Sequence, residues 1–165
     1  AMVVVFFIIF CYKSSAPENN ANKSELRDDE ESRQLLTPDQ KSHFDACYRF
    51  FADYQIQAFH TYIEEHKLDE AIRFNCIKNE KGQTLLVALA AESKVAMLDE
   101  VAKKYKDIID PNARDNAGLT ALHYAIQNSR ADLVGRIANY FGDRLDVFEG
   151  DESGPYRFAL QRIEQ

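Results

Sequence analysis

Residues 115–125 read DNAGLTALHYA and combine the chemistry of a tight turn with that of a helix start. In the turn, Gly118 can adopt a positive φ without the steric cost that a side chain would bring. Two residues later, the hydroxyl of Thr120 can accept a hydrogen bond from a free amide of the next helical turn, as an N-cap does. The stretch therefore predicts a hairpin tip that leads directly into a helix.

Apolar residues continue at helical spacing beyond this stretch. They occupy one helix face in residues 122–126 and again in residues 133–137. Between these segments, Asn128 and Ser129 interrupt the pattern and predict a turn between two short helices. A hairpin tip followed by two helices that are joined by a turn is one unit of a helical solenoid.

The same pattern occurs 36 residues earlier, in residues 79–90, which read NEKGQTLLVALA. Gly118 follows Gly82 by this interval, and the threonines that precede the two helices are separated by the same interval. A further 36 residues lead to Gly154, in the segment DESGPYRFALQ. A period of this length is typical of stacked repeats.

These units resemble ankyrin repeats, whose usual core is D-x-x-G-x-T-P-L-H-x-A-A. The unit at 115–150 matches at Asp115, Gly118, Thr120, Leu122, His123 and Ala125, and has Ala121 where proline is usual. The unit at 79–114 keeps Gly82, Thr84, Leu86 and Ala90, and has Val87 at the histidine position. The segment 151–165 keeps Asp151 and Gly154. The resemblance covers residues 54–165.

The resemblance implies an all-α, ankyrin-like solenoid with an N-terminal helical extension. Its units are expected near 54–78, 79–114 and 115–150, with a C-terminal cap at 151–165. It also implies non-catalytic protein–protein recognition without a cofactor. Short arrays of this family occur in regulatory proteins and in bacterial effectors that act on host proteins, so both settings stay open.

The family binds proteins through its hairpin tips and through the concave face of its inner helices. By position, the expected tip residues are Lys78, Glu80, Lys81, Arg114, Asn116 and Ala117. The expected outward residues of the inner helices are Ala88, Ala91, Glu92, Tyr124, Gln127 and Asn128. Among these, Tyr124 is the expected anchor because tyrosine is enriched at interfaces.

The matching histidine of the family makes hydrogen bonds that tie the hairpin to the helix. The resemblance therefore implies a structural function for His123, and not a catalytic one. We expect its polar atoms to be buried and hydrogen-bonded.

Helices are also expected outside the clearest repeats. Thr37 and Pro38 form a good helix start, and the helix that follows is expected to bury Phe44, Cys47, Tyr48 and Phe51. Further helices are expected over residues 56–63, 68–74, 94–105, 131–141 and 156–163. Gly142 is the expected C-cap of the fourth of these.

The first 36 residues differ in composition from the rest. Residues 1–13 hold an apolar run at 3–10, which is shorter than the roughly 20 residues of a membrane-spanning helix. This run fits a buried strand, the apolar core of an export signal, or a segment before a lipid-modified Cys11. As a strand, it would support a homodimer by pairing with a second copy. Residues 14–36 read as an acidic, polar linker.

Composition limits the classes of partner. The net charge of −7 argues against nucleic acid and against an anionic membrane surface. Three cysteines without CxxC spacing favour a reduced, cytoplasmic compartment. Secretion, or delivery into a host cell, is the alternative.

Reactive residue types are present but lack a catalytic or metal-binding pattern. His43 and Cys47 have a helical spacing that suits zinc, yet two further ligands are missing. His60 and Glu64 share a helix face, and Cys47 with His60 would be a thiol–base pair without a supporting motif. We therefore expect no enzyme and no metal site. A small enzyme that uses Cys47 or a histidine, with the repeats as a docking surface, is the alternative function.

Overall fold

The computed structural model describes residues 38–147 and 154–163. The regular structure in these ranges is helical, with one isolated β-bridge between Lys78 and Thr84 and no strand. The helices are α2 (Pro38–Ala52), α3 (Ile56–Glu65), α4 (Ala71–Asn75), α5 (Leu85–Ala91), α6 (Val95–Tyr105), α7 (Ala121–Gln127), α8 (Ala131–Phe141) and α9 (Pro155–Ile163), and the 3-10 helix η2 (Gly142–Arg144) follows α8. The all-α class is confirmed for this part of the chain. The strand expected at 3–10 and the linker at 14–36 lie outside the described residues.

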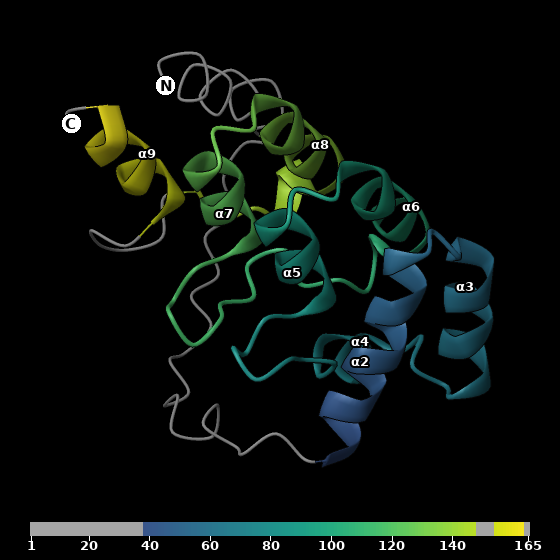
Figure 1. Ribbon diagram of the computed structural model, residues 1–165. Coiled ribbons are helices and arrows are strands. Elements are labelled where there is room, and N and C mark those ends of the chain that lie inside the picture. The colour runs from purple at the N-terminus through teal and green to yellow at the C-terminus, as the bar shows by residue number, and fades with distance from the viewer. Residues whose placement is uncertain (1–37, 148–153, 164–165) are drawn as a thin grey trace.

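The helices lie in two rows (Figure 1). In the first row α5 contacts α7 and α7 contacts α9, and in the second row α6 contacts α8. Helix α2 extends the first row, where the Nζ of Lys94 lies 4.9 Å from the centre of the Tyr48 ring. Helix α3 extends the second row, where the rings of Phe59 and Tyr105 meet edge to face at 5.9 Å.

Two hairpins precede α5 and α7 and have the same hydrogen bonds. In each, the glycine N–H donates to the carbonyl oxygen three residues earlier, at 2.9 Å. The Oδ1 atoms of Asn79 and Asp115 each accept from the backbone amides two and four residues later, at 2.9–3.0 Å. Gly82 and Gly118 have φ values of +72° and +76°, so the predicted positive φ is confirmed.

Threonine caps start both of these helices. The hydroxyl of Thr84 accepts from the N–H of Val87, and that of Thr120 accepts from the N–H of His123, at 3.4 Å in both cases. In the second unit, Nδ1 of His123 accepts the N–H of Thr120 at 3.1 Å, which completes a capping box. His123 is 1% exposed. The expected burial and hydrogen bonding of His123 are therefore confirmed.

Four interhelical turns share one conformation. Tyr54, Lys67, Ser93 and Ser129 have φ values between +53° and +55°. In each turn, this residue's N–H donates three residues back and the next N–H donates five residues back. This is the Schellman pattern, which satisfies carbonyl groups at the end of a helix and reverses the chain. The turn predicted at Asn128 and Ser129 is confirmed.

The buried side chains form one hydrophobic cluster that extends from α2 to α9. Its N-terminal part is aromatic, with the rings of Phe51 and Phe59 at 4.8 Å and those of Phe74 and Tyr105 at 5.0 Å. Its C-terminal part is mostly aliphatic. One core links the two rows of helices, and α4 contributes Phe74 to it. The rows therefore cannot shift independently without losing buried contacts.

Asparagine side chains tie successive parts of the chain together. Asn75 donates to the carbonyl of residue 108 at 2.8 Å and accepts from the N–H of residue 110 at 2.9 Å. Asn112 makes the same pair of bonds with residues 144 and 146, at 2.7 and 2.8 Å. Each asparagine thus satisfies loop backbone groups that no helix can pair.

Two details differ from expectation. The short helix expected at 68–74 is the five-residue α4, where Phe74 is buried but Ile72 is 81% exposed. Consequently α2 and α3, and not α3 and α4, form the helix pair beside α5 and α6. Helix α8 ends at the expected residue, but Gly142 has a φ of −47° and continues into η2 in place of a left-handed cap.

Candidate recognition surface

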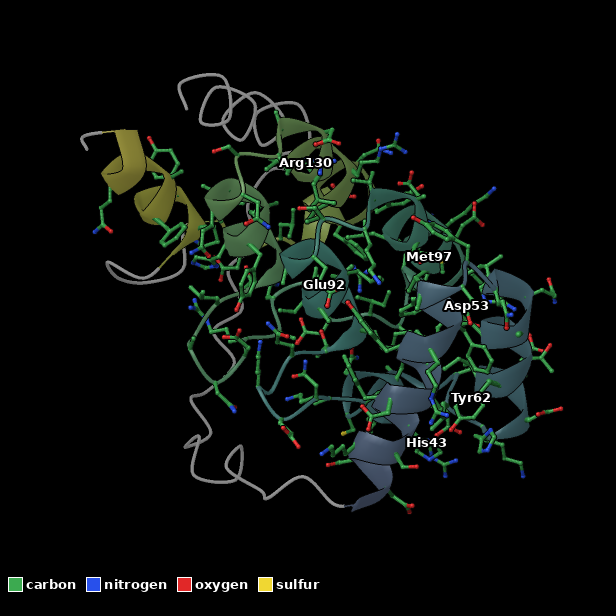
Figure 2. All side chains as sticks on the ribbon, in the orientation of Figure 1. His43, Asp53, Tyr62, Glu92, Met97 and Arg130 are labelled. Atoms are coloured by element: carbon green, nitrogen blue, oxygen red, sulfur yellow. The ribbon has the colours of Figure 1, made fainter. Side chains whose placement is uncertain are left out.

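A hollow of about 440 Å³ lies between α2, the first hairpin and α5. Its lining residues are Lys41, Phe44, Asp45, Tyr48, Asn79, Glu80, Lys81, Gln83, Ala88 and Glu92. Helix α2 has 15 residues, whereas α5 and α7 have 7 each, so its first turns run beside the hairpin. In Figure 2, Glu92 lies at the end of α5, toward α2. We call this feature the α2–hairpin hollow.

The floor of the hollow is apolar. The rings of Phe44 and Tyr48 stack at 5.2 Å with an angle of 13° between their planes. Phe44 and Ala88 are 5% and 4% exposed. The hydroxyl of Tyr48 is buried and makes no hydrogen bond of normal geometry with the described residues. Its burial, and to a smaller extent the neighbouring Glu92 carboxylate, raise the pKa of Tyr48. Tyr48 is therefore neutral at physiological pH.

The walls of the hollow carry both charges. Lys41 of α2 forms an ion pair with Glu80 of the hairpin, and Glu92 lies 3.4 Å from Lys94. Asp45 on α2 and Lys81 on the hairpin form no ion pair with any described residue. Exposed pairs of this kind contribute little to stability, so they chiefly shape the charge pattern of the surface.

A hydrogen-bonded network joins the hollow to the second repeat-like unit. Asn79 donates to Gln83 at 2.9 Å, and Gln83 donates to the hydroxyl of Tyr124 at 3.2 Å. That hydroxyl donates to Oδ2 of Asp115 at 2.6 Å. Burial and this bond raise the pKa of the half-buried Tyr124. Tyr124 therefore links the two hairpins through its hydroxyl group.

Several residues predicted to contact a partner form intramolecular hydrogen bonds. Asn116 donates from its backbone N–H to Lys81 at 2.9 Å and from its amide to Glu80 at 3.1 Å. Asn128 donates to the carbonyl of Ala91 at 3.0 Å. Arg114 donates to the carbonyl of Gly118 at 2.8 Å, inside its own hairpin. These polar groups fix the shape of the surface.

The remaining predicted residues divide by exposure. Glu80, Lys81, Glu92 and Gln127 are exposed, whereas Lys78 and Ala91 are half-buried. The prediction that Ala88 points outward is wrong. Its side chain is 4% exposed because Phe44 and Tyr48 of α2 pack beside it.

The sequence did not predict that four residues of α2 line the surface, namely Lys41, Phe44, Asp45 and Tyr48, nor that Asn79 of the hairpin does. The four residues of α2 recur at i, i+3, i+4 and i+7 and so share one face of the helix. This spacing indicates a shared helix face, but it does not indicate that the face lies beside the first hairpin. Gln83 was missed as well, although it differs from Leu119, which holds the equivalent position 36 residues later.

The reactive residue types occupy structural positions. Cys47 is fully buried, and burial raises the pKa of its thiol to about 12, so almost no thiolate forms near neutral pH. Nδ1 of His43 lies 2.8 Å from the hydroxyl of Tyr62, on the facing sides of α2 and α3 (Figure 2). Nδ1 of His60 lies 3.0 Å from the hydroxyl of Tyr105. Among the described residues, no three His, Cys, Asp or Glu side chains gather as a metal site.

Comparison with protein-family models, with curated proteins and with solved structures found no match. Within residues 38–147 and 154–163, no helix is both long enough and apolar enough to cross a membrane. The assignment of function therefore depends on the geometry of this chain alone.

Proposed function

We propose that this protein is a non-catalytic recognition module of the ankyrin-repeat type, and that it binds a protein partner on the face formed by α2, α5, α7 and the two hairpins. A solenoid of short helix pairs exposes a long surface whose shape is fixed by its repeats. Such a surface suits recognition of a protein partner.

The repeat assignment is supported by geometry that recurs at an interval of 36 residues. The glycine turn, the threonine cap and the Schellman turn of the first unit recur at the same offset in the second. A chance likeness of sequence would not require matched hydrogen bonds at all three places.

The observation that carries the binding proposal is the α2–hairpin hollow next to the Tyr124 network. The hollow combines a small apolar floor of three residues with seven polar or charged lining residues, so a partner would be recognised by polar groups arranged around one apolar contact. The network fixes the positions of the hairpins before binding, so a partner does not have to bear the entropy cost of ordering them. The free cysteines Cys47 and Cys76 are consistent with a reducing compartment, in the cytoplasm of the source cell or of a host.

Matched arginine substitutions test the proposal. Ala91→Arg adds bulk and charge to the half-buried C-terminal part of α5, beside the hollow. Ala96→Arg adds the same side chain at an exposed position of α6, in the second row. The wild type should retain partner proteins from a cell extract. Ala91→Arg should weaken their binding affinity at least tenfold, or about 1.4 kcal/mol, whereas Ala96→Arg should leave it unchanged.

Thermal melting by circular dichroism serves as the folding control for both variants. Equal loss of binding with the two variants, or unchanged binding with Ala91→Arg, would show that this face is not the recognition surface.

A further inference from the structure

The α2–hairpin hollow has a charge pattern that remains after its internal ion pairs are accounted for. Lys41 and Glu80 neutralise each other, and Glu92 has Lys94 within 3.4 Å. Asp45 and Lys81 form no ion pair with any described residue, although Lys41, one helical turn before Asp45, also interacts electrostatically with that carboxylate. The hollow therefore presents a negative charge on α2 that is only partly offset, because Lys41 is shared with Glu80, and a positive charge on the hairpin that forms no ion pair.

The hairpin wall also offers hydrogen-bond donors. A primary amide carries two N–H groups. Gln83 uses one of them on Tyr124, and Asn79 uses one of its own on Gln83. Each amide therefore keeps one N–H beyond these bonds, and Gln83 is only 7% exposed, so its donor is held in a fixed position. Backbone carbonyls of an extended segment are the matching acceptors.

The floor of the hollow determines which side chain of a ligand can be buried there. The stacked Phe44 and Tyr48 rings and the small Ala88 side chain leave room for an apolar side chain together with the backbone that carries it. A phosphate-rich ligand is disfavoured, because three carboxylates and only two ammonium groups line the hollow.

We propose that the α2–hairpin hollow binds an extended peptide segment of a partner protein, with an apolar anchor on the floor, a basic residue beside Asp45 and an acidic residue beside Lys81. This inference rests on the proposed recognition function and specifies the chemistry of its partner. The charges select the segment, and the anchor supplies most of the binding free energy.

A selection from a library of random peptides tests the charge pattern directly. The wild-type chain should enrich peptides that have an apolar residue with a basic residue on one side and an acidic residue on the other. Asp45→Lys should enrich peptides with acidic residues on both sides, and Lys81→Glu should enrich peptides with basic residues on both sides. Asp53→Lys and Lys103→Glu make the same charge changes at exposed positions outside the hollow, and should leave the wild-type pattern unchanged.

Affinities of one enriched peptide, measured by fluorescence anisotropy, give the size of the effect. Each charge reversal in the hollow should weaken binding at least tenfold at low salt, and by less at high salt, because salt screens exposed charges. Thermal melting confirms that each variant is folded.

The outcomes separate this inference from the proposed function. If enriched peptides lose binding with Ala91→Arg but bind Asp45→Lys and Lys81→Glu as well as the wild type, the charge-pattern inference is overturned and the proposed recognition face is retained. If the peptides also bind Ala91→Arg with unchanged affinity, both the charge-pattern inference and the proposed recognition face are overturned.

Discussion

Substitution of alanine for Gly82 tests how closely the two hairpins are packed, and Gly118→Ala is its matched control. Both glycines have a positive φ, which costs an L-residue about 1–2 kcal/mol, partly offset by about 0.4–1 kcal/mol from the stiffer unfolded chain. At Gly118 an added Cβ meets no atom within 4 Å, so we expect only this backbone cost, about 1 kcal/mol net.

At Gly82 the same Cβ would lie 2.3 Å from Oδ1 of Asn116 and 3.1 Å from its backbone nitrogen. Asn116 would have to move, and its bonds to Lys81 and Glu80 would be weakened or lost. At about 0.5–1.5 kcal/mol for each bond, Gly82→Ala should cost about 1–3 kcal/mol more than Gly118→Ala.

Urea unfolding, followed by circular dichroism, gives both free energies. Asn116→Ala should relieve part of the clash, so Gly82→Ala should cost less in that background, as a double-mutant cycle measures. Equal destabilisation by the two glycine variants, together with no coupling to Asn116, would refute the close packing of the hairpins.

Three further variants address the repeat core, a turn and the pH dependence. His123→Ala should lower the free energy of unfolding by about 1–3 kcal/mol, because the buried N–H of Thr120 loses its acceptor; an unchanged urea midpoint would contradict this. Ser129→Gly should raise the free energy of unfolding by about 0.5–1 kcal/mol, because glycine favours the left-handed conformation of this residue. A lower melting temperature would argue against the turn. Burial raises the pKa of Cys47 from 9.0 to about 12, so the stability it contributes is complete below pH 9 and is lost as the pH rises toward 12. Urea midpoints at pH 8 and 10.5 should fall more for the wild type than for Cys47→Ala, and equal falls would exclude a contribution from this thiol.

Local features of the fold were predictable because their determinants lie close together in the chain. The positive φ of Gly118, the cap at Thr120 and the turn at Ser129 each depend on residues within one or two helical turns. The bounds of α6 and α8 agree with the expected helices for the same reason, since apolar spacing and a turn define each end. The 36-residue interval then placed two hairpins in equivalent positions.

The candidate surface was only partly predictable because its contacts join distant residues. Tyr124, Glu80, Lys81 and Glu92 were identified by position in the repeat, and all four contribute to the surface or its network. Ala88 was misplaced because nothing in its own helix indicates that α2 covers it.

The sequence by itself determined the helix starts, the hairpin turns and the buried faces, since hydrogen bonds and apolar spacing over a few residues are enough to specify them. Only the tertiary structure decided that α2 lies beside the first hairpin, where Lys41 and Glu80, 39 residues apart in the chain, form an ion pair. It likewise decided that Gln83 meets Tyr124, 41 residues away. The physical reason is that the packing of one buried core fixes which exposed faces meet, and a helix's own periodicity specifies its buried face but not its neighbour.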